Sequence, residues 1–148
     1  MQTEDRIQIT SEPIDVAAMI AWVSSPQSGG IAIFLGCTRG ETHADGRQLV
    51  ALDYEAYEQM AEPQLHNMVA QARKRWPIIR AAVSHRTGQV LVSEPSVAIV
   101  VGTPHRADAF EACRFLIDEL KKSAAIWKKE IWNEGDASWV KGVLPETK

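Results

Sequence analysis

The feature that most constrains the fold is an almost unbroken apolar run, Val-Ala-Ile-Val-Val, at residues 97–101. A run of mainly β-branched residues without polar alternation is typical of a strand buried on both faces, so we predict a central strand over 96–102. Thr103 and Pro104 follow it. A hydroxyl residue before a proline is a common helix start, so we predict that Thr103 caps a helix extending to about Lys122.

The rest of the chain alternates helical and strand patterns. Apolar residues at helical spacing predict helices over 14–23 and 57–75, and within the 104–122 helix they include Cys113, which we interpret as a small core residue. A single α+β domain over residues 1–148, with a mixed or largely antiparallel sheet, is therefore expected. The other predicted strands, of which we expect the first to be buried, are 31–36, 48–54, 78–84, 89–92 and 126–132.

Composition excludes several classes of protein. The 148 residues carry a net charge of −3, which argues against general nucleic-acid binding, although basic residues are in excess in the second half of the chain. The two cysteines, Cys37 and Cys113, lie far apart and form no CxxC pair, so neither a disulfide framework nor a zinc site is expected. Neither a secretory leader nor a membrane-spanning run is recognisable, which predicts a cytoplasmic protein.

Residues 103–106 form the first candidate site. Here a predicted buried strand leads into a helix whose first turn has free backbone N–H groups beside His105 and Arg106. These donors, the helix dipole and the guanidinium all favour a phosphate or carboxylate. The alternative is that Thr103 and Pro104 form only a cap, with two solvated side chains behind it.

A second candidate site consists of Lys121, at the end of the predicted helix, and Lys128, in the following strand. A lysine can bind an anion, or can act as an acid or base when burial and nearby cations lower its pKa. Strand alternation places Lys128 and Lys129 on opposite faces, so one of them can point into a pocket. The alternative is that Lys121 and its neighbour Lys122 only complement the helix dipole.

Weaker candidates remain open. The four histidines have no metal-ligand spacing, so we expect no metal. His85 and Arg86 either adjoin the anion site or only end a strand. Cys37 is two residues from Arg39, yet a cysteine without an assignable base is usually inert. Tyr54 is interpreted as a packing residue.

Taken together, these segments resemble the family of molybdopterin synthase catalytic (large) subunits over most of the chain. The most specific stretch begins at Pro104, His105 and Arg106 and continues through the helix into the lysine-bearing strand. The segments that carry the resemblance are 30–36 with Arg39, 52–57 with Met60 and Ala61, 76–77, 85–88, 104–113, 117–121, 126–130, and 135–136 with Trp139.

The resemblance implies an enzyme that converts cyclic pyranopterin monophosphate (precursor Z) into molybdopterin by installing two dithiolene sulfurs. The family takes this sulfur from a small ubiquitin-like partner whose C-terminal Gly-Gly carries a thiocarboxylate. The resemblance also implies an α/β hammerhead fold, a homodimer within a heterotetramer, and no metal or diffusible cofactor on this subunit.

Roles of individual residues follow from the same resemblance. Lys121 and Lys128 match the two lysines that meet the partner's C-terminus and serve the chemistry. Residues expected to contact the substrate are Arg39, His105 and Arg106, and at lower rank Cys37, Thr38, Lys129 and Glu130.

The sequence departs from the family pattern at two positions. Cys37 stands where a basic residue is frequent, which is expected to weaken one anion contact. Ala125 stands where proline is usual, which leaves the helix end less sharply defined. Two alternatives to the synthase reaction are another enzyme acting on a phosphorylated small molecule, and a non-catalytic scaffold that binds a ubiquitin-like partner.

Overall fold

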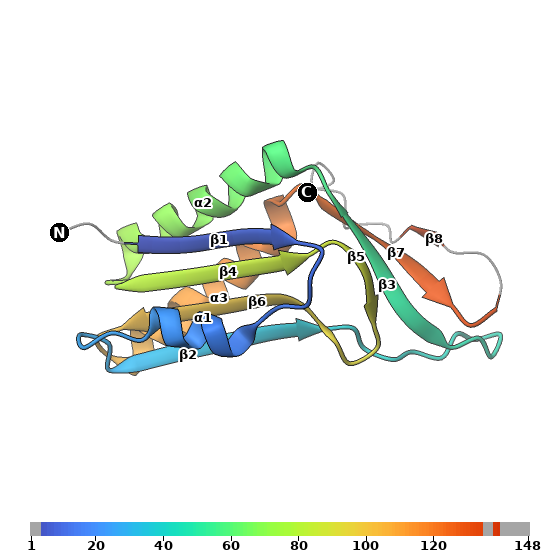
Figure 1. Ribbon diagram of the computed structural model, residues 1–148, viewed down its shortest axis with the longest axis horizontal. Coiled ribbons are helices and arrows are strands. Elements are labelled where there is room, and N and C mark those ends of the chain that lie inside the picture. Colours follow the sequence, from blue (N-terminus) through green and yellow to red (C-terminus); the bar gives the residue numbers. More distant parts are fainter. Residues whose placement is uncertain (1–3, 135–137, 140–148) are drawn as a thin grey trace.

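Two four-stranded sheets and three helices make up the described part of the chain (Figure 1). The structure is a computed structural model that describes residues 4–134 and 138–139 of the chain. The strands of the larger sheet, in spatial order, are β1 (Glu4–Thr10), β4 (Arg80–Arg86), β6 (Pro95–Thr103) and β2 (Gly30–Cys37). Those of the smaller sheet are β5 (Gly88–Leu91), β3 (Leu49–Ala56), β7 (Ile126–Trp132) and β8 (Ser138–Trp139). The helices are α1 (Val16–Val23), α2 (Glu58–Arg75) and α3 (Arg106–Ser123).

The α+β prediction is confirmed, with one difference in the sheets. The strands form two separate sheets, where the sequence predicted one. The larger sheet is mixed, because β1 runs parallel to β4 while the pairs β4–β6 and β6–β2 are antiparallel. β1 was not predicted, since its Glu-Asp-Arg-Ile-Gln-Ile-Thr sequence has too few apolar residues to stand out.

The apolar run is central, as predicted, and it organises the core. β6 lies between β4 and β2, and all of its residues after Pro95 are buried. On one face of the sheet it packs against α2 and α3, where Leu65 and Leu116 are fully buried. On the other face the shorter α1 packs against Ala82 and Val100.

The prediction that the strand beginning at Ile31 is buried is wrong on one face. β2 is at the edge of its sheet, and Ala32 points into the core shared with α2 and α3. The alternate side chains, Ile31, Ile33 and Leu35, are 37%, 45% and 40% exposed. They face the side of the sheet that carries α1, whose main packing contacts are with β6 and β4.

The predicted start of α3 also needs correction. Thr103 is the last residue of β6, and its hydroxyl donates to the carbonyl of His105 (2.6 Å) rather than capping a helix. The helix itself begins at Arg106, so Pro104 lies outside its first turn. Turn formation by the Thr103 side chain therefore competes with the capping role that its sequence context predicts.

Core packing under α3 yields a direct test. Leu116→Ala removes a fully buried side chain, and we expect it to lower the free energy of unfolding by roughly 2–5 kcal/mol in urea titrations followed by circular dichroism. Arg114→Ala is a control on the exposed side of the same helix, and we expect a change below about 0.5 kcal/mol. Equal losses in the two variants would contradict this packing.

Candidate active site

A cavity of about 620 Å³ opens where the two sheets meet. Its walls come from the end of β2, the loop after it, β3, β4, β6, the last turns of α3, and β7. The charged residues that line it are Arg39, Glu41, Lys121, Lys128 and Glu130. With three cations against two carboxylates, the lining suits an anionic ligand.

Lys121 and Lys128 reach this cavity from two consecutive elements. Lys121 lies in the last turn of α3, and β7 begins at Ile126, after two buried alanines. The alternation predicted for β7 is confirmed, since Lys128 lines the cavity and Lys129 does not. Lys129 instead pairs in register with Asp53 of β3.

Lys128 has a perturbed protonation equilibrium. Burial is the main reason that its pKa lies below the usual value, and the positive charge of Lys121 is the next. Glu130 and Glu41 act in the opposite direction, while Arg39 lowers the pKa further. A lysine that loses its proton more readily is better suited to acid–base chemistry or nucleophilic attack.

The turn between α3 and β7 is fixed despite the absence of proline. Ala125 is completely buried, and its backbone N–H donates to Oε1 of Gln64 in α2 (2.7 Å). The carbonyl of Ala125 accepts from the backbone N–H of Tyr57 (3.0 Å). A proline could not make the first of these bonds, so α2 holds the turn here through a contact that the more usual residue lacks.

The other predicted substrate contacts fall into two groups. Arg39, Cys37 and Glu130 line the cavity, and both Arg39 and Cys37 are exposed. Thr38 is buried outside it, where its hydroxyl donates to the carbonyl of Val90 (3.3 Å). Lys129, as noted, is on the other face of β7.

His105 and Arg106 are not brought to the cavity. They are exposed at the beginning of α3, whereas Lys121 is near its end, fifteen residues beyond Arg106. At 1.5 Å per residue this corresponds to about 22 Å along the helix axis. Within one chain, these two residues and the lysines therefore belong to different regions of the surface.

His85, for which a place beside an anion site was one of two alternatives, and Tyr54, which was interpreted as a packing residue, both line the cavity. Their rings meet edge to face with centroids 4.9 Å apart. The hydroxyl of Tyr54 donates to Ser96 (3.3 Å), and that of Ser96 donates to the carbonyl of Gly36 (3.2 Å). The sequence marks a His-Arg pair at a strand end, but it does not reveal the burial that distinguishes a site residue from a surface one.

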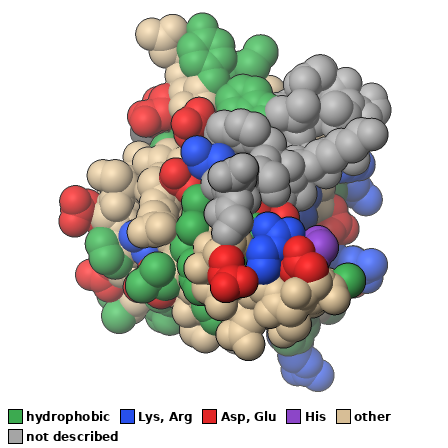
Figure 2. Space-filling view, turned by 90° about the vertical axis from the view of Figure 1, so that its right-hand side faces the viewer, with side chains coloured by type: hydrophobic (Ala, Val, Ile, Leu, Met, Phe, Trp, Pro, Cys, Tyr) green, Lys and Arg blue, Asp and Glu red, His purple; other side chains and the backbone are tan. Residues whose placement is uncertain are grey.

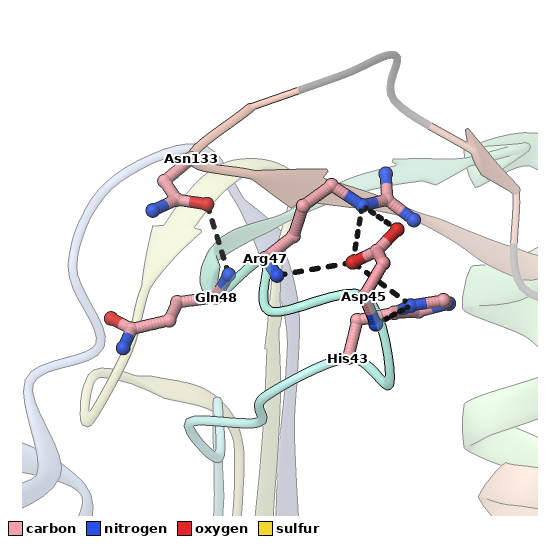
Figure 3. A network of polar contacts seen from close by, with 5 residues as sticks. All are labelled: His43, Asp45, Arg47, Gln48 and Asn133. Carbon is pink, nitrogen blue, oxygen red and sulfur yellow. Dashed lines mark hydrogen bonds and ion pairs between the residues drawn. The ribbon is translucent and has the colours of Figure 1, made fainter.

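The loop that carries Arg39 and Glu41 is anchored by a polar network at its far end (Figure 3). Arg47 donates to Asp45 through its backbone N–H (3.0 Å) and through Nε, which contacts both carboxylate oxygens (3.1 and 2.9 Å). The Asp45 backbone N–H donates to Nδ1 of His43 (3.2 Å). The backbone N–H of Arg47 is the main reason that the pKa of Asp45 is lowered.

This network rests on the end of β7. The guanidinium of Arg47 lies 5.3 Å from the ring centroid of Trp132, and the His43 ring meets the same ring edge-on at 5.5 Å. Gln48 and Asn133 join the two segments by reciprocal hydrogen bonds of 2.9 Å. On this end of the molecule, acidic and basic side chains adjoin one another on the surface (Figure 2).

Within residues 4–134 and 138–139, no three histidine, cysteine or acidic side chains are grouped so that they could hold a metal ion. None of the described helices is long and apolar enough to span a membrane.

Asp45→Asn tests the loop network. We expect faster amide exchange at Gly46 and Leu49, with global stability unchanged, because the substitution removes the carboxylate that binds Arg47 while the folded core is untouched. Since the pKa of Asp45 is depressed, the network is complete above the ordinary value of 3.8 and is lost as the pH falls through the lower folded value. Protection in the wild type should decrease over that acidic range.

Hydrogen exchange read by mass spectrometry provides the measurement, and Glu55→Gln, at an exposed position of β3, is the control. Unchanged protection of the loop in Asp45→Asn would show that the network does not anchor it.

Comparisons with known proteins find a matching family and similar solved structures. The family model described as MoaE protein matches residues 9–123. The molybdopterin synthase catalytic subunit of Nostoc sp. is 39% identical over 138 residues, which are 93% of this chain and 82% of that protein. The crystal structure of molybdopterin synthase from Staphylococcus aureus superimposes with a TM-score of 0.83 at 34% identity, covering 89% of this chain and 94% of that one.

A third protein shares the fold at lower identity. It belongs to a solved complex of subunits 1 and 2 of molybdopterin-converting factor from Helicobacter pylori. Its TM-score is 0.73 at 20% identity, and the match covers 93% of this chain and 90% of that one.

Proposed function

Because the chain belongs to the MoaE family of molybdopterin synthase catalytic subunits, we propose that it installs two sulfurs on cyclic pyranopterin monophosphate in the cavity between its sheets. Membership in this family makes it a sulfur-transferring enzyme of molybdenum cofactor biosynthesis. The observation that carries the proposal is the convergence of Lys121, Lys128 and Arg39 on one cavity from three different segments.

The charges of the reactants fit this cavity. The substrate is a phosphate ester and the sulfur donor is a thiocarboxylate, so both are anions that cationic side chains stabilise. The thiocarboxylate sulfur attacks a carbon of the pterin side chain and displaces an oxygen substituent from it. Lys128 moves a proton to that leaving oxygen, while Lys121 orients the donor and stabilises charge on its acyl group. Water then cleaves the acyl–sulfur bond, so that the sulfur stays on the pterin and the donor leaves as an ordinary carboxylate.

The donor in this proposal is a small ubiquitin-like subunit whose C-terminal Gly-Gly tail enters the cavity. Support comes from the cavity itself, which is open to solvent through the exposed Lys121 and Arg39 and is large enough for an extended peptide end beside a small molecule. Both cysteines are free thiols, in keeping with a cytoplasmic location, which is part of the proposal.

A homodimer would bring His105 and Arg106 to the same chemistry. The start of β2 adjoins them, since a Cβ on Gly30 would lie 2.8 Å from the Cα of Arg106, and its other end, at Cys37, lines the cavity. Two copies that meet along β2 about a twofold axis place the start of one strand against the end of the other. The exposed side chains of Ile31, Ile33 and Leu35 supply an apolar surface for that contact.

Lys128→Ala tests the assigned chemistry. We expect turnover to fall by roughly 10²–10⁴-fold, the usual contribution of a general acid–base group, while affinity for the small subunit is kept. The assay is anaerobic, with thiocarboxylated small subunit and cyclic pyranopterin monophosphate, and it quantifies molybdopterin by mass spectrometry. Lys122→Ala, an exposed lysine paired with Glu119 (3.0 Å), is the matched control.

Wild-type turnover in Lys128→Ala would show that the assignment of this lysine is wrong. A wild-type protein that binds the small subunit without forming product would indicate a scaffold. Absence of both binding and product would point to an enzyme acting on another phosphorylated molecule.

The homodimer proposal predicts complementation. Lys128→Ala and Arg106→Ala should each be inactive alone, yet an exchanged 1:1 mixture should recover about a quarter of wild-type turnover, because about half of the dimers are mixed and each mixed dimer holds one intact site. A mixture no more active than its components, although mass spectrometry detects mixed dimers, would contradict a shared site.

A further inference from the structure

His85 is buried in the wall of the cavity, and the reaction described above gives it no role. It lies on β4 on the same face as Ala81 and Val83, which belong to the core under α2 and α3. Only 4% of its surface is accessible, and it borders the cavity that holds the two lysines.

The hydrogen bond of this imidazole defines its tautomer. Nδ1 lies 2.8 Å from the carbonyl oxygen of Arg86, which can only accept, so Nδ1 carries the proton. In the neutral ring Nε2 then has a lone pair and no hydrogen. Among the described residues Nε2 has no hydrogen-bond partner, and it is not one of the fully buried atoms that lack one, so this acceptor is accessible from the cavity that His85 lines.

The surroundings keep the ring neutral. Burial is the main cause that lowers the pKa of His85 to about 4, against the opposing effect of its bond to Arg86, and the charges of Lys121 and then Lys128 lower it further. The other charged groups that line the cavity are Arg39 and Glu41 from the loop and Glu130 from β7. The neighbours of His85 in the sheet, Ile9 and Val97, are apolar.

We propose that His85 is a positioning residue of the sulfur-transfer site, whose Nε2 accepts a hydrogen bond from the ammonium group of Lys121 and holds it charged and directed into the cavity. An acceptor that binds the ammonium form stabilises that form, so it keeps the side chain positively charged. Lys128, which has a lowered pKa, is then the lysine that moves protons, and Lys121 remains the fixed positive charge. The two roles are thereby divided, and this division rests on the proposed function.

Two substitutions of His85 separate its two nitrogen atoms. His85→Asn keeps an N–H donor near the position of Nδ1 and removes the acceptor at Nε2. His85→Gln reaches the position of Nε2 and can present its amide oxygen there. His66→Asn, at an exposed position of α2, is the control for a histidine outside the site.

Lysine protonation can be read without substrate. Trace labelling with acetic anhydride, with peptides resolved by mass spectrometry, gives the reactivity of each lysine amine. We expect Lys121 to be labelled about tenfold faster in His85→Asn, since a hydrogen bond to a charged group is lost, and at the wild-type rate in His85→Gln. An unchanged Lys121 in His85→Asn, or equal effects of the two substitutions, would overturn the proposal.

Wild-type protein supplies a test that does not depend on the folding of a His85 variant. Imidazole ¹⁵N NMR should show a protonated Nδ1 and a bare Nε2, and the Nε2 signal should move in Lys121→Met but stay in Lys122→Met. A proton on Nε2, or a signal that Lys121→Met leaves in place, would overturn the proposal.

The effect of His85 on catalysis is tested by measuring the turnover of its variants. Turnover should fall about tenfold in His85→Asn and recover in His85→Gln, with the small-subunit affinity of both unchanged. Unchanged turnover of His85→Asn in an active preparation would overturn the catalytic role. If the wild type itself transferred no sulfur, the labelling and NMR results would still decide whether His85 binds Lys121, so the two failures are distinguishable.

Discussion

The site depends on the buried turn between α3 and β7. Only Ala124 and Ala125 separate the helix from the strand, and both are buried. The two backbone bonds of Ala125, to Gln64 and Tyr57, fix the direction in which β7 leaves the helix. Because that direction is fixed, a lysine at the end of the helix and a lysine two residues into the strand share one cavity.

This closeness of like charges has chemical consequences. Burial, and next the positive charge of Lys121, lowers the pKa of Lys128. Burial, together with the charges of both lysines, keeps His85 neutral. One arrangement therefore accounts for both proposed properties of the site, a lining suited to anionic reactants and a lysine suited to proton transfer. The carboxylates of Glu130 and Glu41 oppose the lowering of the Lys128 pKa.

Local sequence patterns predicted a large part of this arrangement. The apolar run identified β6 as central, and strand alternation correctly predicted that only one of Lys128 and Lys129 faces the cavity, which the structure shows to be Lys128. The sequence predictions were wrong where the position of a residue in the folded structure overrides its local sequence pattern. The apolar residues of β2 are exposed on one face because that strand is at a sheet edge, and Thr103 makes a turn in place of a cap. The burial of His85 depends on packing between distant segments, so no local signal could reveal it.

The most direct test of the account is the location of bound substrate. Hydrogen exchange by mass spectrometry on the wild-type protein, with and without saturating cyclic pyranopterin monophosphate, would map it. The account predicts protection concentrated at the segments that line the cavity, namely residues 36–41 and 120–130 and the strand end at His85. Protection confined to other surfaces, such as the cavity between α1 and β1, would contradict the claim that sulfur transfer takes place between the two sheets.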